Sequence, residues 1–202
     1  MAVISLKESR LEKLIDYQAS EYCGCDMFKL MAYTDNLQNV NPKNPFIHLA
    51  EGMLYARYKP PNRSYPQSLW HLNLFLKAYP DHEHAVWWRL DSATEVISGT
   101  PYIKFLSRIT KEAIISFPKS IPILNAAYDA YNKGILDTRE ALKVATRIHY
   151  LCPGDGEIRK NIDLLMDTLK DEERVKKSFS VKFRKGPKVF SLRGVGFDNK
   201  KC

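Results

Sequence analysis

The chain has 202 residues, 45% of them hydrophobic and 27% charged, with a formal net charge of +8 at pH 7. This composition suits one folded domain, or one domain with a tail, built around a hydrophobic core. No apolar run reaches the roughly 18 residues of a membrane span, and the first residues lack the basic and apolar segments of a secretory signal.

The positive charge is concentrated towards the C-terminal end. From Arg174 to Cys202 ten Lys and Arg residues stand against one acid, Asp198, which gives +9. Residues 1–173 hold the other 21 basic and 22 acidic residues, a charge of −1. We therefore expect a helical domain over 1–173 and a basic, aromatic tail over 174–202 that is extended or partly disordered.

The four cysteines do not form the pattern of a disulfide framework. Cys23 and Cys25 are nearly adjacent, and Cys152 and Cys202 stand alone. We expect an intracellular, reduced protein with a cytoplasmic location, while nuclear and organellar locations stay open.

Two helices are predicted at the N-terminus. Apolar residues recur every three to four positions from Leu6 to Gln18, and Ser5 suits the N-cap. Gly24 breaks this pattern, and Asp26 suits the N-cap of a second helix over 26–37.

Four regularly spaced prolines organise the rest of the chain. Pro45, Pro80, Pro118 and Pro153 lie 35, 38 and 35 residues apart, and each closes one helical run and precedes another. The helices predicted between them are 46–58, 66–78, 82–97 with Asp81 as its cap, 101–116, 120–132 and 137–151. A last helix over 157–170 pairs an apolar stripe with charges, as the end cap of a repeat stack requires. The sequence therefore predicts an all-α stack of helix pairs.

The third unit carries the pattern of a known repeat. Its characteristic residues are Ile123-Leu124-Asn125-Ala126-Ala127-Tyr128-Asp129-Ala130-Tyr131, Gly134, Glu140-Ala141-Leu142, Ala145 and Cys152-Pro153. Residues 46–170 thus resemble tetratricopeptide repeats. The resemblance implies a right-handed superhelix of antiparallel helix pairs, with three repeats between an N-terminal helix pair and a C-terminal capping helix, followed by a basic non-helical tail.

The other two units match this pattern less closely. The second keeps Leu90, Ala93, Ala113 and Pro118 but is three residues longer. The first keeps Leu54, Tyr55, Tyr58 and Pro80, and it places Glu51 where an apolar residue is expected.

The resemblance also implies that one face of each first helix lines a concave groove. The candidate groove residues are His84, Trp87, Asp91, Thr94, Glu95, Asn125, Asp129, Asn132 and Lys133. Polar and acidic groups around one indole suit a peptide site, although an ordinary solvated face has the same composition. Because Trp87 and Trp88 point about 100° apart on a helix, at least one of them must pack against a neighbouring repeat or be partly exposed, and we expect packing.

The tail alternates apolar and polar residues over 178–185 and again over 188–193, which predicts strands. The candidate contact residues for an acidic partner or a nucleic acid are Lys176, Lys177, Phe179, Lys182, Phe183, Arg184, Lys185, Lys188, Phe190 and Arg193. Basic residues interleaved with phenylalanines suit both kinds of partner. Because an isolated hairpin is only marginally stable, we expect this segment to become ordered on a partner or against the helical domain. A disordered, solvated tail is the alternative, and its apolar residues argue against it.

No sequence motif indicates catalysis. The chain has no phosphate-binding glycine loop, no Gly-x-Ser-x-Gly and no His-Glu-x-x-His. Residues 81–84 offer four potential metal ligands, but consecutive helical residues point in different directions. Cys23 and Cys25 have no second pair of thiols to complete a zinc site. We predict no enzymatic activity, no cofactor and no metal site.

Three functions remain open from the sequence. The first is a non-enzymatic scaffold or adaptor in a multi-subunit complex, which binds a peptide in the groove and an acidic partner through the tail. The second is an RNA-binding component of a ribonucleoprotein particle. The third, a minor one, is a prenyltransferase alpha-like subunit, because Pro80 and Ala85-Val86-Trp87-Trp88-Arg89 faintly resemble the repeat of that family. The Trp-to-Arg spacing departs from that repeat.

Overall fold

The computed structural model describes residues 6–22, 24–57, 64–96 and 100–184, and every regular element in these stretches is a helix. The elements are α1 (Leu6–Ser20), α2 (Met27–Val40), α3 (Pro45–Arg57), α4 (Tyr65–Ala78), α5 (Glu83–Glu95), α6 (Thr100–Ser116), α7 (Ile121–Asp129), the π-helix η1 (Ala130–Ile135), α8 (Thr138–Leu151) and α9 (Gly156–Arg184). The predicted all-α class is confirmed. No helix in this part of the chain is long and apolar enough to cross a membrane.

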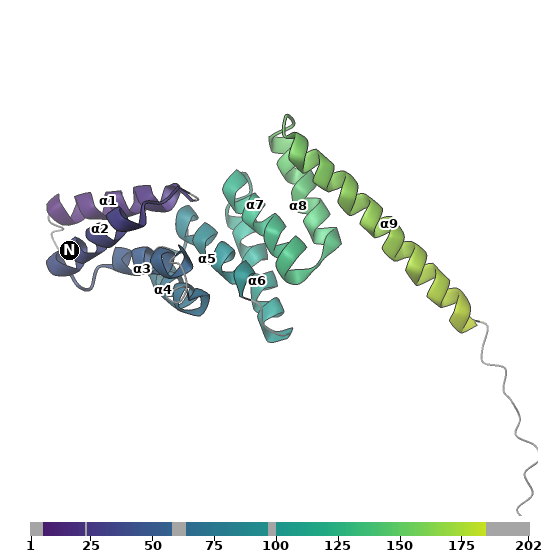
Figure 1. Ribbon diagram of the computed structural model, residues 1–202, viewed down its shortest axis with the longest axis horizontal. Helices are drawn as coiled ribbons and strands as arrows, with labels where there is room; N and C mark the ends of the chain where they lie inside the picture. Colours follow the sequence, from purple (N-terminus) through teal and green to yellow (C-terminus); the bar gives the residue numbers. More distant parts are fainter. Residues whose placement is uncertain (1–5, 23, 58–63, 97–99, 185–202) are drawn as a thin grey trace, which may run out of the picture.

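The helices follow one another in a row from α1 to α9 (Figure 1). Neighbours in the chain pack together, above all α3 with α4, α4 with α5, α7 with α8 and α8 with α9. Helix α5 holds a central place, because it also contacts α1, α3, α6 and α7. Its side chains therefore reach both the N-terminal helices and the region around α7.

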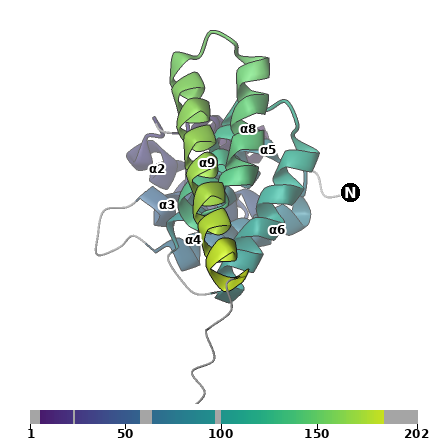
Figure 2. The ribbon, with the colours of Figure 1, turned by 90° about the vertical axis from the view of Figure 1, so that its right-hand side faces the viewer.

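Helix α9 is longer than predicted. It packs beside α8 at its start (Figure 2) and continues to Arg184, so the non-helical structure predicted from residue 174, and the strand period over 178–184, are wrong. The charged run 171–174 favours helix, and ion pairs such as Arg174–Asp171 at 3.2 Å support it. A lone strand has no such local support. Residues 185–202, including Lys185, Lys188, Phe190 and Arg193, lie outside the described residues.

The turns after α4, α6 and α8 share one geometry. Tyr79, Phe117 and Cys152 each cap a helix and donate their N–H to the carbonyl four positions earlier, at 3.0, 2.9 and 2.8 Å. A proline follows each of them and cannot continue the helix. The three helix stops predicted at these prolines are confirmed.

Pro45 is different, because it is the first residue of α3. The side chain of Asn44 accepts a hydrogen bond from the N–H of Phe46 at 2.9 Å, and proline is favourable at the first helical position. The feature that repeats at a constant interval is therefore the start of the first helix of each pair, and not the proline. Asn44, His82 and Ser120 directly precede α3, α5 and α7 at intervals of 38 residues.

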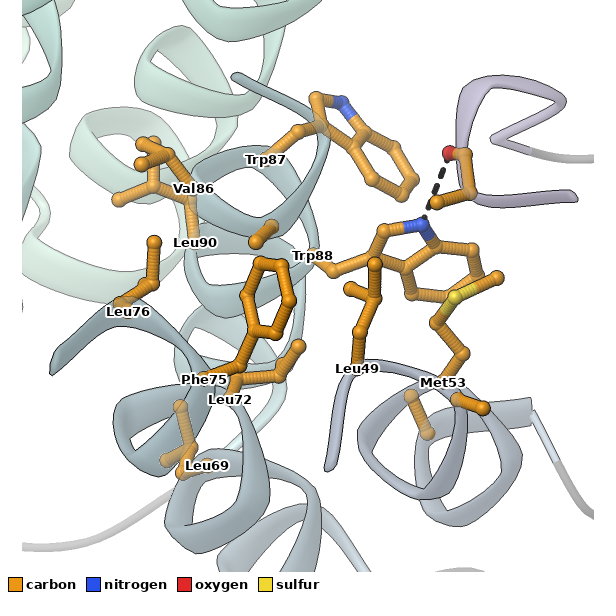
Figure 3. Close-up of a cluster of buried hydrophobic side chains, with 14 of the residues drawn as sticks. Leu49, Met53, Leu69, Leu72, Phe75, Leu76, Val86, Trp87, Trp88 and Leu90 are labelled. Atoms are coloured by element: carbon orange, nitrogen blue, oxygen red, sulfur yellow. Dashed lines mark hydrogen bonds between the residues drawn. The ribbon is translucent and has the colours of Figure 1, made fainter. Parts of the chain in front are cut away.

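The larger of two hydrophobic clusters joins α1 through α7 and surrounds Trp88 (Figure 3). Trp88 is fully buried, and its Nε1 donates a hydrogen bond to the Ala19 carbonyl at 3.1 Å. Trp87 is only 8% exposed and lies with its ring centroid 4.7 Å from that of Tyr22. Both indoles therefore pack against neighbouring helices, as predicted. The second cluster joins α7, η1, α8 and α9, so α7 contributes to both.

Candidate functional site

A concave pocket of about 100 Å³ lies between α5 and the α7–η1 segment. It is lined by Trp87, Asp91, Thr94 and Glu95 from α5 and by Asn125, Ala126, Asp129 and Lys133 from α7 and η1. Seven of the nine candidate groove residues thus come together, whereas His84 and Asn132 do not line the pocket. We call this site the α5–α7 pocket.

The π-helix shapes one wall of the pocket. The helix predicted over 120–132 is too short, because it continues to Ile135 and ends at Leu136, whose φ of 58° is left-handed. A side chain on Gly134 would begin 2.6 Å from a methyl of Leu106 on α6, so only glycine allows this close approach. The continued helix brings the Lys133 ammonium to 2.9 Å from the Asp129 carboxylate. That contact raises the pKa of Lys133, which stays charged.

Three carboxylates and one ammonium line the pocket, which gives it a formal charge of −2. Asp91 lies 3.6 Å from the guanidinium of Arg57, and that guanidinium is 5.0 Å from the ring centroid of Trp88. Glu95, at the end of α5, is exposed to solvent. The pocket is therefore an acidic site in which the charged groups of Glu95 and Lys133 are exposed to solvent.

Trp87 has a different role from the aromatic anchor that the sequence predicts. Its indole packs on Tyr22 and under Arg57, at 5.9 Å from the guanidinium, and little of it is exposed. It therefore forms an apolar wall, and the groups available to a ligand are the polar ones around it.

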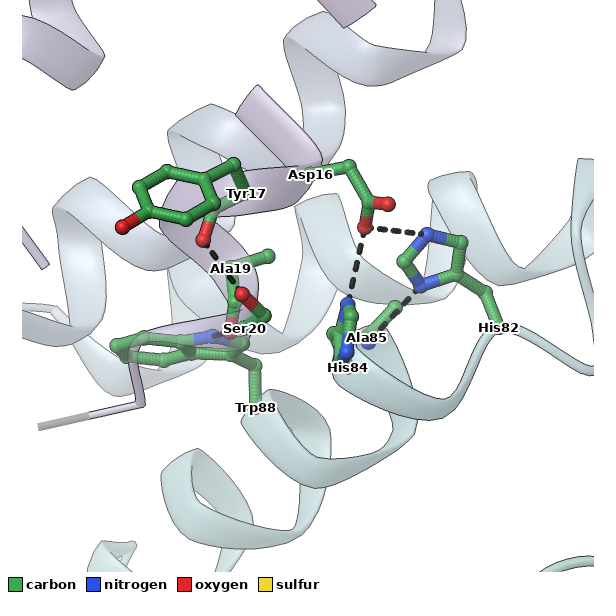
Figure 4. A network of polar contacts seen from close by, with 8 residues as sticks. All are labelled: Asp16, Tyr17, Ala19, Ser20, His82, His84, Ala85 and Trp88. Atoms are coloured by element: carbon green, nitrogen blue, oxygen red, sulfur yellow. Dashed lines mark hydrogen bonds and ion pairs between the residues drawn. The ribbon is translucent and has the colours of Figure 1, made fainter. Parts of the chain in front are cut away.

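His84 lies in a separate cluster that connects α1 to the start of α5 (Figure 4). One oxygen of Asp16, Oδ1, is 3.1 Å from His82 Nε2 and 3.0 Å from His84 Nδ1. Hydrogen bonds from these two histidines hold the pKa of Asp16 well below its usual range. His82, and not the predicted Asp81, is the N-cap of α5, because its Nδ1 accepts the N–H of Ala85 at 3.3 Å.

A second histidine cluster lies between α3 and α4. His71 Nδ1 is 2.8 Å from Glu51 Oε2 and 3.1 Å from His48 Nδ1. The hydrogen bond from His71 lowers the pKa of Glu51. Among the described residues these two clusters are the groups of three side chains with metal-ligand chemistry. His82 and His84 are among the potential ligands noted at residues 81–84, but no sequence signal joins them to Asp16. The signal for the second cluster is Glu51, at a position expected to be apolar.

Cys25 shows none of the features of a reactive thiol. Its side chain is half-buried, and burial raises the pKa of the thiol to about 11, so it is protonated at neutral pH. Cys23, the other thiol of the Cys-x-Cys sequence, lies outside the described residues.

The candidate tail residues are covered only in part. Lys176 is exposed on α9 and lies beside Glu172, Arg139 and Leu136. Lys177, Phe179, Lys182, Phe183 and Arg184 belong to the helical end of α9. The structure therefore does not bring the tail residues into one described site.

Comparison with protein families, with curated proteins and with solved structures finds no match for this chain.

Proposed function

We propose that the chain is a non-enzymatic protein-interaction module, a tetratricopeptide-like right-handed superhelix that binds a peptide segment along the face carrying the α5–α7 pocket. The observation that carries the proposal is the convergence of Asp91, Glu95 and Asp129 around one concave pocket. The proposal also includes an intracellular location and a place in a multi-subunit complex.

The size and charge of the pocket define what it accepts. A volume of about 100 Å³ is well below the roughly 300–1,000 Å³ of small-molecule and cofactor sites. It holds the end of one side chain. The lining has a formal charge of −2, which the Arg57 guanidinium beside Asp91 reduces to −1. The matching group is therefore the guanidinium or ammonium of Arg or Lys, and Asn125 and Thr94 supply further acceptors. The ligand is thus a peptide with a basic residue at its centre.

Selection of random peptides displayed on phage against the full-length protein tests this function. We expect an enriched motif that contains Arg or Lys. Binding of the selected peptide should weaken at least tenfold, about 1.4 kcal/mol, when Glu95→Lys or Asp129→Lys reverses a pocket charge. Glu112→Lys is the matched control, because Glu112 is also an exposed helical acid but lies on α6 and pairs with Arg108. No enrichment, or equal binding by all variants, contradicts the proposal.

The +9 segment from residue 174 supports a second contact with an acidic partner. Its charge also suits RNA, so the test must distinguish RNA binding from binding of an acidic protein. Binding of a single-stranded RNA should fall steeply between low and physiological salt if the alternative holds. It should also weaken on deletion of residues 185–202, which removes five of the ten basic residues of the segment. Unchanged RNA affinity after that deletion contradicts it.

A further inference from the structure

We propose that His48, Glu51 and His71 form a binding site for Zn²⁺ between α3 and α4. The donor atoms are His48 Nδ1, His71 Nδ1 and Glu51 Oε2. Their separations are 3.1 Å between the two nitrogens, 2.8 Å from His71 to Glu51 and 3.6 Å from His48 to Glu51. Zinc bonds of 2.0–2.1 Å in a tetrahedron place neighbouring ligands about 3.3 Å apart. The three atoms thus have the dimensions of one face of a zinc tetrahedron.

The proton count of the cluster favours a cation. When His71 Nδ1 carries a proton, it can donate to Glu51 and to His48. His48 Nδ1 then turns a lone pair towards the Glu51 carboxylate oxygen, 3.6 Å away. When His48 Nδ1 is protonated as well, two N–H groups face each other at 3.1 Å. A divalent ion accepts all three lone pairs at once and removes both conflicts.

The regular helix caps show that these histidines replace apolar residues. His48 lies four residues after Asn44, as Val86 follows His82 and Leu124 follows Ser120. Val86 and Leu124 are 3% and 0% exposed.

The same holds on the second helix of each unit. His71 lies eight residues before the cap Tyr79, as Ile109 precedes Phe117 and Val144 precedes Cys152. Ile109 and Val144 are 1% and 5% exposed. The first helix pair therefore has two histidines in contact where the next two helix pairs have buried apolar residues. Because an ordinary hydrophobic pair stabilises such an interface at least as well, the polar contact points to a ligand.

Aromatic neighbours hold the two imidazoles in place. The ring of Trp70 meets His71 edge-on at 4.6 Å and His48 at 6.0 Å, while Tyr55 stacks on His71 at 5.4 Å. Such support limits reorganisation when the ion binds. The His71 side chain is 12% exposed and that of His48 37%, so the cluster lies at the surface with one side open. Water, or a group of a bound molecule, can fill the fourth zinc position.

The cluster of Asp16, His82 and His84 differs in one decisive way. His82 Nδ1 accepts the N–H of Ala85, so in the neutral ring Nε2 carries the proton and donates to Asp16. Metal binding through Nε2 moves that proton to Nδ1, against the Ala85 N–H. This cluster is therefore complete as a hydrogen-bond network, and it supplies the control.

Titration of the metal-free, full-length protein with Zn²⁺, followed by calorimetry, tests the proposal. We expect one site whose affinity falls at least 100-fold in His48→Gln and in Glu51→Gln. His84→Gln should leave it unchanged. Circular dichroism of each variant checks that it folds. No binding above that of the double variant His48→Gln/Glu51→Gln, or equal loss in His84→Gln, overturns the site.

Co²⁺ as a probe gives a readout that does not depend on these variants. Bound Co²⁺ should show the visible absorption of a tetrahedral ion without thiolate charge transfer, and it should quench Trp70, the exposed indole. Trp70→Phe should remove most of the quenching, because the other two indoles, Trp87 and Trp88, are buried. A thiolate band that disappears in Cys25→Ser places the ion at the cysteines and contradicts the proposal. Because the peptide assay uses Glu95 and Asp129, failure of either proposal leaves the other measurable.

Discussion

The indole N–H of Trp88 on α5 and the carbonyl of Ala19 at the end of α1 form a hydrogen bond of 3.1 Å between residues 69 positions apart. Ala19 is in the last turn of α1, where carbonyls lack partners within the helix. The bond therefore completes a helix end and attaches the N-terminal helix pair to the centre of the molecule.

Trp88→Ala should lower the free energy of unfolding by about 3–5 kcal/mol, the usual cost of truncating a buried tryptophan. Trp88→Phe should cost about 1–3 kcal/mol, because a ring remains while the Ala19 carbonyl loses its donor. Urea unfolding followed by fluorescence measures both, since Trp70 and Trp87 remain as reporters. Trp70→Phe, at a side chain 58% exposed, is the control and should change the free energy by no more than about 0.5 kcal/mol. Equal effects at positions 88 and 70 contradict the assignment of Trp88 to the core.

Ser68 on α4 and Ser92 on α5 form a fully buried hydroxyl pair at 2.8 Å. Ser68→Ala alone should destabilise by about 1–3 kcal/mol, because the Ser92 hydroxyl loses its partner while still buried. The double variant Ser68→Ala/Ser92→Ala should be less destabilised than the sum of the two single variants. A double-mutant cycle in urea measures this coupling, and strictly additive losses argue against the pair.

Gly52 on α3 should not tolerate a methyl group. A Cβ there would lie 2.6 and 2.9 Å from two side-chain carbons of Leu72, which is fully buried and cannot move aside. Overpacking costs about 1–3 kcal/mol, more than the roughly 1 kcal/mol that alanine gains over glycine in a helix. Gly52→Ala should thus lower the urea midpoint. In Gly156→Ala, where nothing lies within 4 Å, the same change should leave the midpoint unchanged or raise it.

Asp16 should make stability depend on acid pH. Its pKa in the folded chain is well below the ordinary value, first because of the hydrogen bond from His82 and then that from His84. Above about pH 4 the carboxylate is ionised in both states and its stabilisation is fully present. Below about pH 4 the unfolded chain takes up a proton that the folded chain resists, so the stabilisation is lost as the pH falls.

The comparison of Asp16→Asn with the unmodified chain at pH 7 and pH 3 measures this loss. The difference in unfolding free energy should be about 1 kcal/mol at pH 7, since a side chain 42% exposed is screened by water, and it should shrink at pH 3. Glu51, whose pKa is also lowered, is present in both proteins and cancels. A difference that grows in acid has the wrong sign for this mechanism.

Local chemistry makes much of the fold predictable from the sequence. Asp26 is a predicted N-cap, and its side chain accepts the N–H of Lys29. Ser120 and Asp137, predicted as the first residues of their helices, cap α7 and α8 in the same way. A cap needs only a short polar side chain at the right backbone position. Seven of the residues that the resemblance to tetratricopeptide repeats places on a groove-lining face line the α5–α7 pocket.

The histidine clusters are not predictable in this way. Asp16 and His84 are 68 residues apart, and their contact depends on how α1 packs against α5. Residues 81–84 do not all lie on a helix, because His82 is a cap with extended backbone, and so it can converge with His84. The length of α9 is not predicted, because apolar and polar residues alternate over 178–185. In a short segment this pattern indicates a strand more strongly than helix propensity indicates a helix.

Helix α7 has one face in each of the two hydrophobic clusters: Ile123 and Ala126 lie in the larger, Leu124 and Ala127 in the smaller. Opening of α8 and α9 in hydrogen exchange therefore uncovers one side of α7 and leaves the other side packed. The smaller cluster has fewer buried partners, so its amides should exchange through a lower-energy, partial opening. A peptide held between α5 and α7 would slow that exchange from a distance, through the shared helix.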